Sequence, residues 1–183
     1  MKKVLLSILI LVLCACSINS TAKKTIEDYL NGYKYLSNEV LQDLDKVTNE
    51  ENLTDEQKNN YKEALKRQYQ SLNYEILKES YNGDDAIVTT KVEVYDLYQA
   101  QQQASEYLKK NLTKFNNEKG VYDNNLYLNY KINLMKTTNE RVSYVIDFNL
   151  VRENGNWVLK EISSSDLEKI HGIYNYEYDK NSK

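Results

Sequence analysis

The sequence predicts an α+β domain in which N-terminal helices cover one face of a curved antiparallel sheet. Apolar residues alternate with polar ones over residues 126–134 and 142–150, and again at Trp157 and Leu159. A two-residue period with turn residues between the segments is typical of a three-stranded meander with one buried face. Earlier in the chain apolar residues recur with helical spacing, so we expect helices that bury one stripe against that face.

Residues 1–16 carry the most specific motif of the chain. Two lysines precede an apolar run, which ends in Leu13-Cys14-Ala15-Cys16. This ending resembles the lipobox of bacterial lipoproteins, Leu-x-(Ala/Gly)-Cys, at each of its positions. The resemblance implies that a signal peptide, residues 1–15, is removed. It also implies that Cys16 receives a thioether-linked diacylglycerol, whose chains are fatty acids such as palmitate.

Two alternatives stay open for this leader, a plain anchor helix and a secretory leader with incidental cysteines. The apolar run of roughly ten residues is shorter than a membrane-spanning helix needs. Cys14 is the less suitable acceptor, because the bulky Leu13 would then precede the cut. Two acyl chains give stable anchoring. The leader therefore predicts a lipid-anchored protein on the extracytoplasmic face of the cell membrane.

The rest of the chain predicts one domain between a tether and a tail. Residues 16–24 are expected to form a lipidated tether, whose eight residues after Cys16 reach at most about 29 Å. Residues 25–172 predict a single α+β domain. In residues 173–183 tyrosines alternate with polar residues, which fits a small edge strand or a loose tyrosine-rich tail, and we favour the tail. Both cysteines lie in the leader, so this domain has no internal disulfide and depends on packing.

Three amphipathic helices are expected before the sheet. The first begins near Thr25, the second after Ser37, and the third after Thr54, which forms a capping box with Gln57. Their apolar stripes are Ile26, Tyr29, Leu30 and Tyr33; Val40, Leu41, Leu44 and Val47; and Tyr61, Ala64, Leu65, Tyr69 and Leu72. Because short helices are marginal alone in water, each needs an apolar partner.

A β-hairpin and another helix follow. Residues 74–81 and 86–97 predict strands on either side of an Asn82-Gly83 turn. The register stays open, with either Leu77 or Ile76 opposite Val88. Residues 98–115 then predict a helix, for which Gly120 is a plausible stop.

The register of the final meander follows from its turns. A two-residue turn at Asn154-Gly155 sets Leu150 opposite Leu159. The same register sets Phe148 opposite Glu161. A three-residue turn over residues 137–139 sets Leu134 opposite Val142, which keeps the apolar residues on one face. A capping box over residues 165–168 then predicts a short helix that ends at Gly172.

The order of these elements resembles the nuclear transport factor two-like superfamily, a cone-shaped α+β fold. The resemblance covers residues 25–172, and its local motif is the Asn-Gly-x-Trp turn at residues 154–157. Members include small isomerases, dehydratases and many binding or scaffolding domains. The resemblance implies a cone that can hold a pocket, but fold alone does not give a function.

A candidate pocket is expected on the inner face of the meander. Its predicted lining is Tyr130, Tyr144, Phe148, Trp157 and Glu161. Aromatic side chains there suit an aromatic or amphipathic ligand, although such residues also simply fill cores. A carboxyl in apolar surroundings is a candidate acid or base, whereas a strand end at the mouth of the cone is wet. His171, the only histidine, lacks a predicted nucleophile or metal partner.

Several classes of function are disfavoured. The net charge of −3 argues against nucleic-acid binding, which needs a basic surface. Glycine-rich phosphate loops are absent from the sequence, so no nucleotide cofactor is expected. Paired acids such as Asp43 and Asp45 lack the spacing of a coordinating loop, so no metal is expected either.

Three functional hypotheses follow. The first is a membrane-anchored domain that binds a protein or small molecule near the bilayer without catalysis. The second is a small enzyme of the isomerase or hydrolase type that uses Glu161 inside the cone. The third is a structural envelope protein that forms a homodimer through the exposed face of its sheet.

Overall fold

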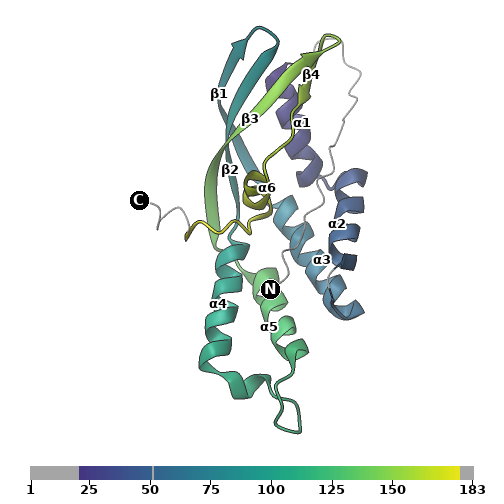
Figure 1. Cartoon of the computed structure of the whole chain (residues 1–183), viewed down its shortest axis with the longest axis vertical. Coiled ribbons are helices and arrows are strands. Elements are labelled where there is room, and N and C mark those ends of the chain that lie inside the picture. Colours follow the sequence, from purple (N-terminus) through teal and green to yellow (C-terminus); the bar gives the residue numbers. More distant parts are fainter. Residues whose placement is uncertain (1–20, 51, 178–183) are drawn as a thin grey trace.

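The computed structural model describes residues 21–50 and 52–177, so the predicted signal peptide and Cys16 lie outside the described residues. This part is an α+β domain with six α-helices and one four-stranded antiparallel sheet (Figure 1), which confirms the predicted fold class. The elements are α1 (Ala22–Lys34), α2 (Asn38–Glu50), α3 (Asp55–Gln70), β1 (Asn73–Asn82), β2 (Asp85–Tyr95), α4 (Leu97–Lys110), the 3₁₀ helix η1 (Leu112–Phe115), α5 (Asn124–Thr137), β3 (Arg141–Glu153), β4 (Asn156–Leu159) and α6 (Ser164–His171).

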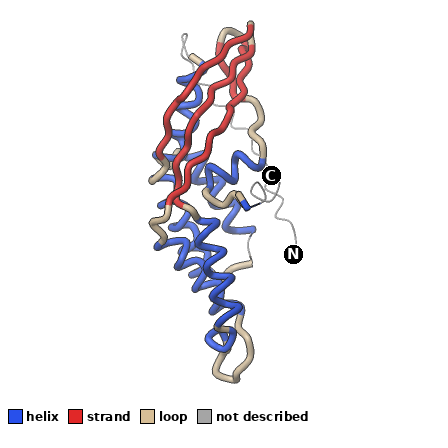
Figure 2. The backbone as a smooth tube through the Cα atoms, turned by 90° about the vertical axis from the view of Figure 1, so that its left-hand side faces the viewer, coloured by secondary structure: helices blue, strands red, loops and turns tan. Residues whose placement is uncertain are grey.

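The sheet has the order β1-β2-β3-β4, and each neighbouring pair is antiparallel. In β3 the even-numbered side chains from Ile146 to Leu150 are buried, while the odd-numbered ones through Asn149 are exposed, as the alternation predicts. Helices α1, α3 and α6 contact β2, and their buried residues form one core with those of β3. Figure 2 shows no described helix across the opposite, outer face.

The first three helices form as predicted, with one earlier start. Thr54 and Gln57 make the expected capping box, and Ser37 Oγ accepts from the Val40 amide at 3.4 Å. Helix α1, however, begins at Ala22, because Thr21 rather than Thr25 caps it. Ala22 is fully buried. Residues 22–24 therefore belong to the domain, and their assignment to the tether was wrong.

The β1–β2 hairpin is present, but both predicted registers are wrong. The turn is Gly83-Asp84, closed by Asn82 opposite Asp85, and Val88 lies opposite Glu79. Gly83 has a φ of 61°. Glycine with positive φ at the first turn position is typical of a type II′ turn. A register shift between Ile76 and Lys78 then takes up one residue.

The largest correction concerns residues 126–134, which were predicted to form a strand. They belong to α5, which pairs with α4 in a helical hairpin that extends from one end of the sheet (Figure 1). We call residues 97–137 the arm. β2 takes the place beside β3, so Val142 lies opposite Val94 and not opposite Leu134. The three-residue turn predicted at residues 137–139 is likewise absent.

The end of the chain returns to the sheet. Leu150 lies opposite Leu159 across an Asn154-Gly155 turn with positive φ at both positions, as predicted. The strand ends at Leu159, so the predicted pairing of Phe148 with Glu161 is not formed. Helix α6 is capped by Ser163 rather than Ser165, and it ends at Gly172 as expected.

Gly172 and Gln68 join α6 to the rest of the domain. The buried Gln68 amide donates from Nε2 to the Ile170 carbonyl at 3.3 Å, and its Oε1 accepts from the Tyr95 amide at 2.9 Å. The Gly172 carbonyl accepts from the Tyr98 amide at 2.8 Å. These bonds fix α6 where α3, β2 and α4 meet, which closes the core at the base of the sheet.

Candidate functional site

The predicted pocket residues do not come together. Tyr130 lies on α5 in the arm, where its ring stacks on Tyr107 at 4.8 Å and meets Phe115 edge-on at 5.7 Å. Tyr144 and Phe148 lie on β3, and Trp157 on β4. Since α5 is helical, Tyr130 leaves the inner face of the sheet altogether. The lining expected from alternation is therefore split between the arm and the sheet.

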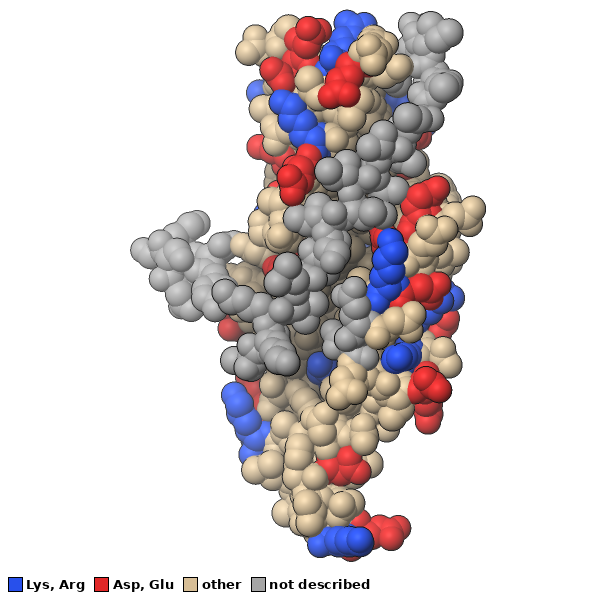
Figure 3. Space-filling view, turned by 45° about the vertical axis from the view of Figure 1, so that its right-hand side comes forward, with Lys and Arg blue, Asp and Glu red and all other residues tan. Residues whose placement is uncertain are grey.

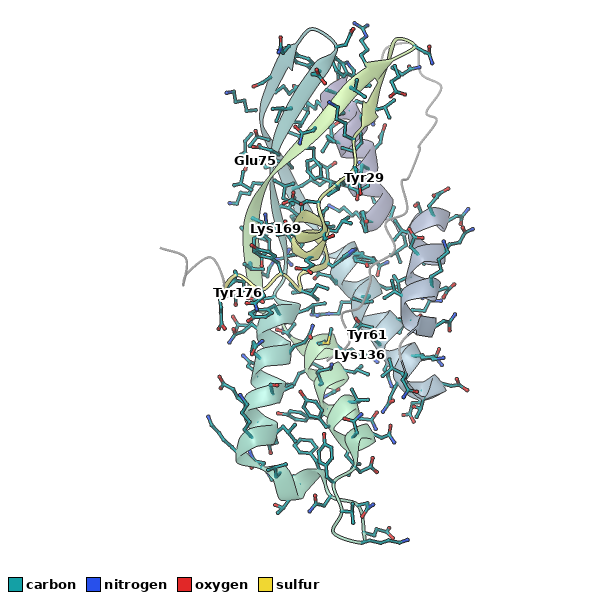
Figure 4. All side chains as sticks on the ribbon, viewed as in Figure 1. Tyr29, Tyr61, Glu75, Lys136, Lys169 and Tyr176 are labelled. Carbon is teal, nitrogen blue, oxygen red and sulfur yellow. The ribbon has the colours of Figure 1, made fainter. Side chains whose placement is uncertain are left out.

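Phe148 and Trp157 serve the core and its edge. Phe148 is buried against the ring of Tyr29 at 6.1 Å, inside the sheet–α1 layer where Figure 4 places Tyr29. Trp157 is partly buried, with its ring 5.5 Å from that of Tyr81. The Trp157 carbonyl accepts from Thr25 Oγ1 at 3.3 Å, which ties β4 to α1. Both residues are accounted for by packing.

Glu161 does not enter an apolar pocket. It follows the end of β4 and its side chain is exposed. The enzyme hypothesis depended on this carboxyl in apolar surroundings, and the fold does not provide them. The reason is the early end of β4, which releases the chain toward α6 two residues before the expected pair.

Tyr144 belongs instead to a group at the base of the sheet, which we call the waist cluster: Asp96, Tyr98, Tyr144, Tyr174 and Tyr176. Asp96 caps α4 by accepting from the Gln99 amide at 2.8 Å, and its other oxygen accepts from the Tyr176 hydroxyl at 3.0 Å. The rings of Tyr98 and Tyr176 meet at 5.1 Å, and those of Tyr144 and Tyr174 at 5.8 Å. Residues 173–177 are thus docked, and the loose tail predicted there was wrong.

The waist cluster keeps two of its phenols, those of Tyr144 and Tyr176, neutral. Burial is the main cause that raises the pKa of Tyr176 to about 12, and the negative charge of Asp96 adds to it. Burial likewise raises the pKa of Tyr144, whose buried hydroxyl has no hydrogen-bond partner among the described residues. Neutral phenols and a capping carboxylate form a structural joint rather than a nucleophile and its base. Figure 4 shows Tyr176 at this joint, beside the start of α4.

A second aromatic group lies beneath the sheet, made of Tyr29, Tyr33, Tyr69 and His171. The hydroxyls of Tyr29 and Tyr33 lie 3.3 Å apart. The ring of His171 is 5.8 Å from that of Tyr33 and 5.5 Å from that of Tyr69. Burial lowers the pKa of His171 to about 4, and its buried Nδ1 has no hydrogen-bond partner among the described residues. The neutral imidazole, partly buried between the two tyrosine rings, has a packing role.

The sequence analysis missed one apolar surface, which lies at the end of the arm. Four apolar side chains there are exposed, and we call them the tip patch: Leu112, Val121, Tyr122 and Leu126. Val121 and Tyr122 stand in an otherwise polar connection, and that isolation is the signal that could have identified them. Their common location was hidden, because residues 126–134 were expected in the sheet and not in the arm.

The described residues hold neither a candidate metal cluster nor a candidate membrane span. Among residues 21–50 and 52–177, no group of three or more His, Cys, Asp or Glu side chains is placed to hold a metal ion. No helix in that part is both long and apolar enough to cross a bilayer. In Figure 3 charged side chains of both signs are interspersed over the part of the domain above the arm, while much of the visible arm surface is uncharged.

Comparison with known proteins gave no match: no protein family, no curated protein and no solved structure resembles this chain at a significant level.

Proposed function

We propose that this protein is a membrane-anchored extracytoplasmic lipoprotein whose domain binds a partner or ligand without catalysis. The observation that carries the proposal is the sequence Leu13-Cys14-Ala15-Cys16 after a short apolar run. Its complete lipobox pattern supports acylation of Cys16, and two acyl chains suffice for stable anchoring. Palmitate is one of the fatty acids that such an anchor can carry.

The placement of the ionisable side chains supports the absence of catalysis. Asp96 is used as a helix cap, and His171 is enclosed by tyrosine rings. Glu161 is exposed, so it has no enclosed site in which to act. A catalytic acid or base needs both a suitable pKa and reach to a bound substrate. We therefore favour binding over the isomerase or hydrolase alternative.

The anchor also sets an orientation. Helix α1 begins beside the turns of the sheet, whereas the arm leaves the opposite end (Figure 1). Four residues lie between Cys16 and Thr21, so the five Cα–Cα steps of the tether reach at most about 18 Å. An acylated Cys16 then holds the turn end of the sheet close to the bilayer.

The two cysteines of the leader provide a matched test. A Cys16→Ala variant should lose the lipid and leave the detergent phase in a phase-partitioning experiment, because the acylated thiol is gone. A Cys14→Ala variant removes the neighbouring thiol but keeps the lipobox, so it should partition as the wild type does. Unchanged partitioning of Cys16→Ala, or equal loss in both variants, would contradict the proposed anchor.

Two further assignments stay predictions. The nuclear transport factor two-like assignment is supported by the helices before the sheet and by the turn at residues 154–157. Against it, residues 126–134 are helical where the expected order has a strand. The homodimer hypothesis is favoured by the uncovered outer face of the sheet, where Val145 is 58% exposed. Sedimentation of the unacylated chain tests it, and a strict monomer at high concentration would exclude it.

A further inference from the structure

We propose that the tip patch of the arm binds the surface of an anionic phospholipid bilayer. The four side chains of the patch come from η1, from the connection after it and from the first turn of α5. Leu112 is 57% exposed, Val121 60%, Tyr122 42% and Leu126 40%. Aliphatic groups with an amphipathic tyrosine are suited to the boundary between headgroups and acyl chains.

Charge at the tip has the sign that such a surface requires. Residues 107–126, which include the whole patch, contain four lysines and two acids, Glu118 and Asp123, although the whole chain has a net charge of −3. The lysines are exposed: Lys109, Lys110, Lys114 and Lys119. Basic side chains close to an anionic bilayer contribute on the order of fivefold each to its binding constant. The apolar and basic side chains of the tip would thus both favour binding to an anionic bilayer.

The tip is held in place before any binding. The connection between η1 and α5 is held together by two contacts. The Asp123 amide donates to the Phe115 carbonyl at 2.7 Å, and a β-bridge joins Asn116 to Tyr122. Behind it the rings of Phe115 and Tyr127 meet edge-on at 5.8 Å. A patch that is already ordered loses little conformational freedom on binding. The exposed apolar groups therefore remain available to a partner.

The small size of the patch favours a bilayer over a protein. Four partly exposed side chains are far fewer than the roughly 20 residues on each side of a stable protein interface. A second copy of the chain would also bring like charges together across the tip. A bilayer needs only a few inserted side chains, and its headgroups complement the lysines. If Cys16 is acylated, the same bilayer is already at high effective concentration.

The location of the tip defines how the molecule would sit. The arm and the turn end of the sheet lie at opposite ends of the long axis in Figure 1. The 11 residues of β2 and the 14 of α4 together extend on the order of 50 Å. Anchor and tip therefore reach one bilayer only when the long axis lies along its surface. The lipid anchor of the proposed function adds to the binding but is not needed for the tip to bind.

The test uses the chain from Ser17 to Lys183, which lacks the acyl acceptor and keeps each described element. Binding is measured by cosedimentation with vesicles of phosphatidylcholine alone, or of equal parts phosphatidylcholine and phosphatidylglycerol. We expect binding to the anionic vesicles that weakens as salt is added, and much weaker binding to the neutral ones. No binding to anionic vesicles, or equal binding to both, would overturn the proposal.

Variants locate the contact. Leu112→Ser with Val121→Ser should lower the binding constant by about tenfold or more. Lys109→Gln with Lys110→Gln should lower it on anionic vesicles and reduce the effect of salt. The control pair is Ile87→Ser with Val145→Ser, which removes comparably exposed apolar groups from the sheet. Thermal unfolding verifies that each variant is folded.

Two outcomes separate this proposal from others. If the control pair weakens binding as much as the tip pair, the contact is not at the tip. If the chain instead forms dimers that the tip pair dissociates, without binding vesicles, the occupant is a second copy, and the bilayer proposal fails. Neither outcome touches the partitioning of Cys16→Ala, so failure of the tip and failure of the anchor are distinguishable.

Discussion

At the base of the sheet, single residues determine whether α3, β2 and α6 can pack together. Gly172 has a φ of 72°, and a Cβ there would collide with the Tyr95 carbonyl and lie 2.8 Å from the Gln68 amide nitrogen. Both neighbours are fixed by hydrogen bonds that join α3, β2 and α6. Gly172 is therefore required both for its backbone conformation and for close approach.

A Gly172→Ala substitution should lower the free energy of unfolding by about 3 kcal/mol, because strain at positive φ adds to overpacking. Gly120 provides the control. Its φ is 75°, but nothing lies within 4 Å of a Cβ placed there. Gly120→Ala should cost only about 1 kcal/mol. Urea unfolding of both variants measures the difference, and equal losses would contradict the proposed close packing at Gly172.

His171 gives the domain a specific dependence on pH. Burial lowers the pKa of His171 to about 4 in the folded protein, whereas the imidazole has its ordinary pKa of 6.5 in the unfolded chain. Above pH 6.5 the imidazole is neutral in both states. Between pH 6.5 and 4 the unfolded chain binds a proton that the folded chain does not, so stability falls as pH falls. The total loss is roughly 3 kcal/mol and levels off below pH 4.

A His171→Phe variant isolates this effect, because phenylalanine keeps a ring between Tyr33 and Tyr69 but cannot titrate. The wild type should lose roughly 3 kcal/mol relative to this variant between pH 7 and pH 4. Unfolding by urea at several pH values provides the measurement. Parallel pH curves for the two proteins would show that His171 is not buried as described.

At the scale of elements, the sequence predicted local structure correctly where particular residues favour one backbone conformation. The Asn154-Gly155 turn, the Thr54–Gln57 capping box and the alternation within β3 all appear as predicted. Each depends on residues close in sequence, whose backbone preferences decide the outcome. These elements could therefore be predicted without knowledge of the tertiary structure.

Helix α5 shows where local reasoning fails. Its apolar residues alternate, yet they also fit helical spacing, with Leu128, Ile132 and Met135 on one side. Periodicity cannot separate a short strand from a helix when both patterns fit. Tertiary contacts decide, since Gln57 Nε2 of α3 donates to Asn129 Oδ1 at 2.9 Å, and β2 occupies the edge of β3. The error moved Tyr130 into the wrong site and hid the tip patch.

At the scale of the whole molecule, a sheet-and-helix body carries a helical arm at the end opposite α1. In the body, Asp96 and His171 have structural roles among tyrosine rings, whereas the arm exposes apolar groups among lysines. A lipid at Cys16 and the patch at the tip would give the protein two membrane contacts of different strength. In this proposal the acyl chains would provide the stable contact, and the tip would provide a reversible one that salt weakens.

The central claim is that the mature protein begins at an acylated Cys16, and mass spectrometry of its N-terminal peptide tests this most directly. Protein purified from membranes should yield a peptide that starts at Cys16 and carries the added mass of a diacylglycerol with its fatty acids. A peptide that starts at another residue, or that starts at Cys16 without lipid, would contradict the account.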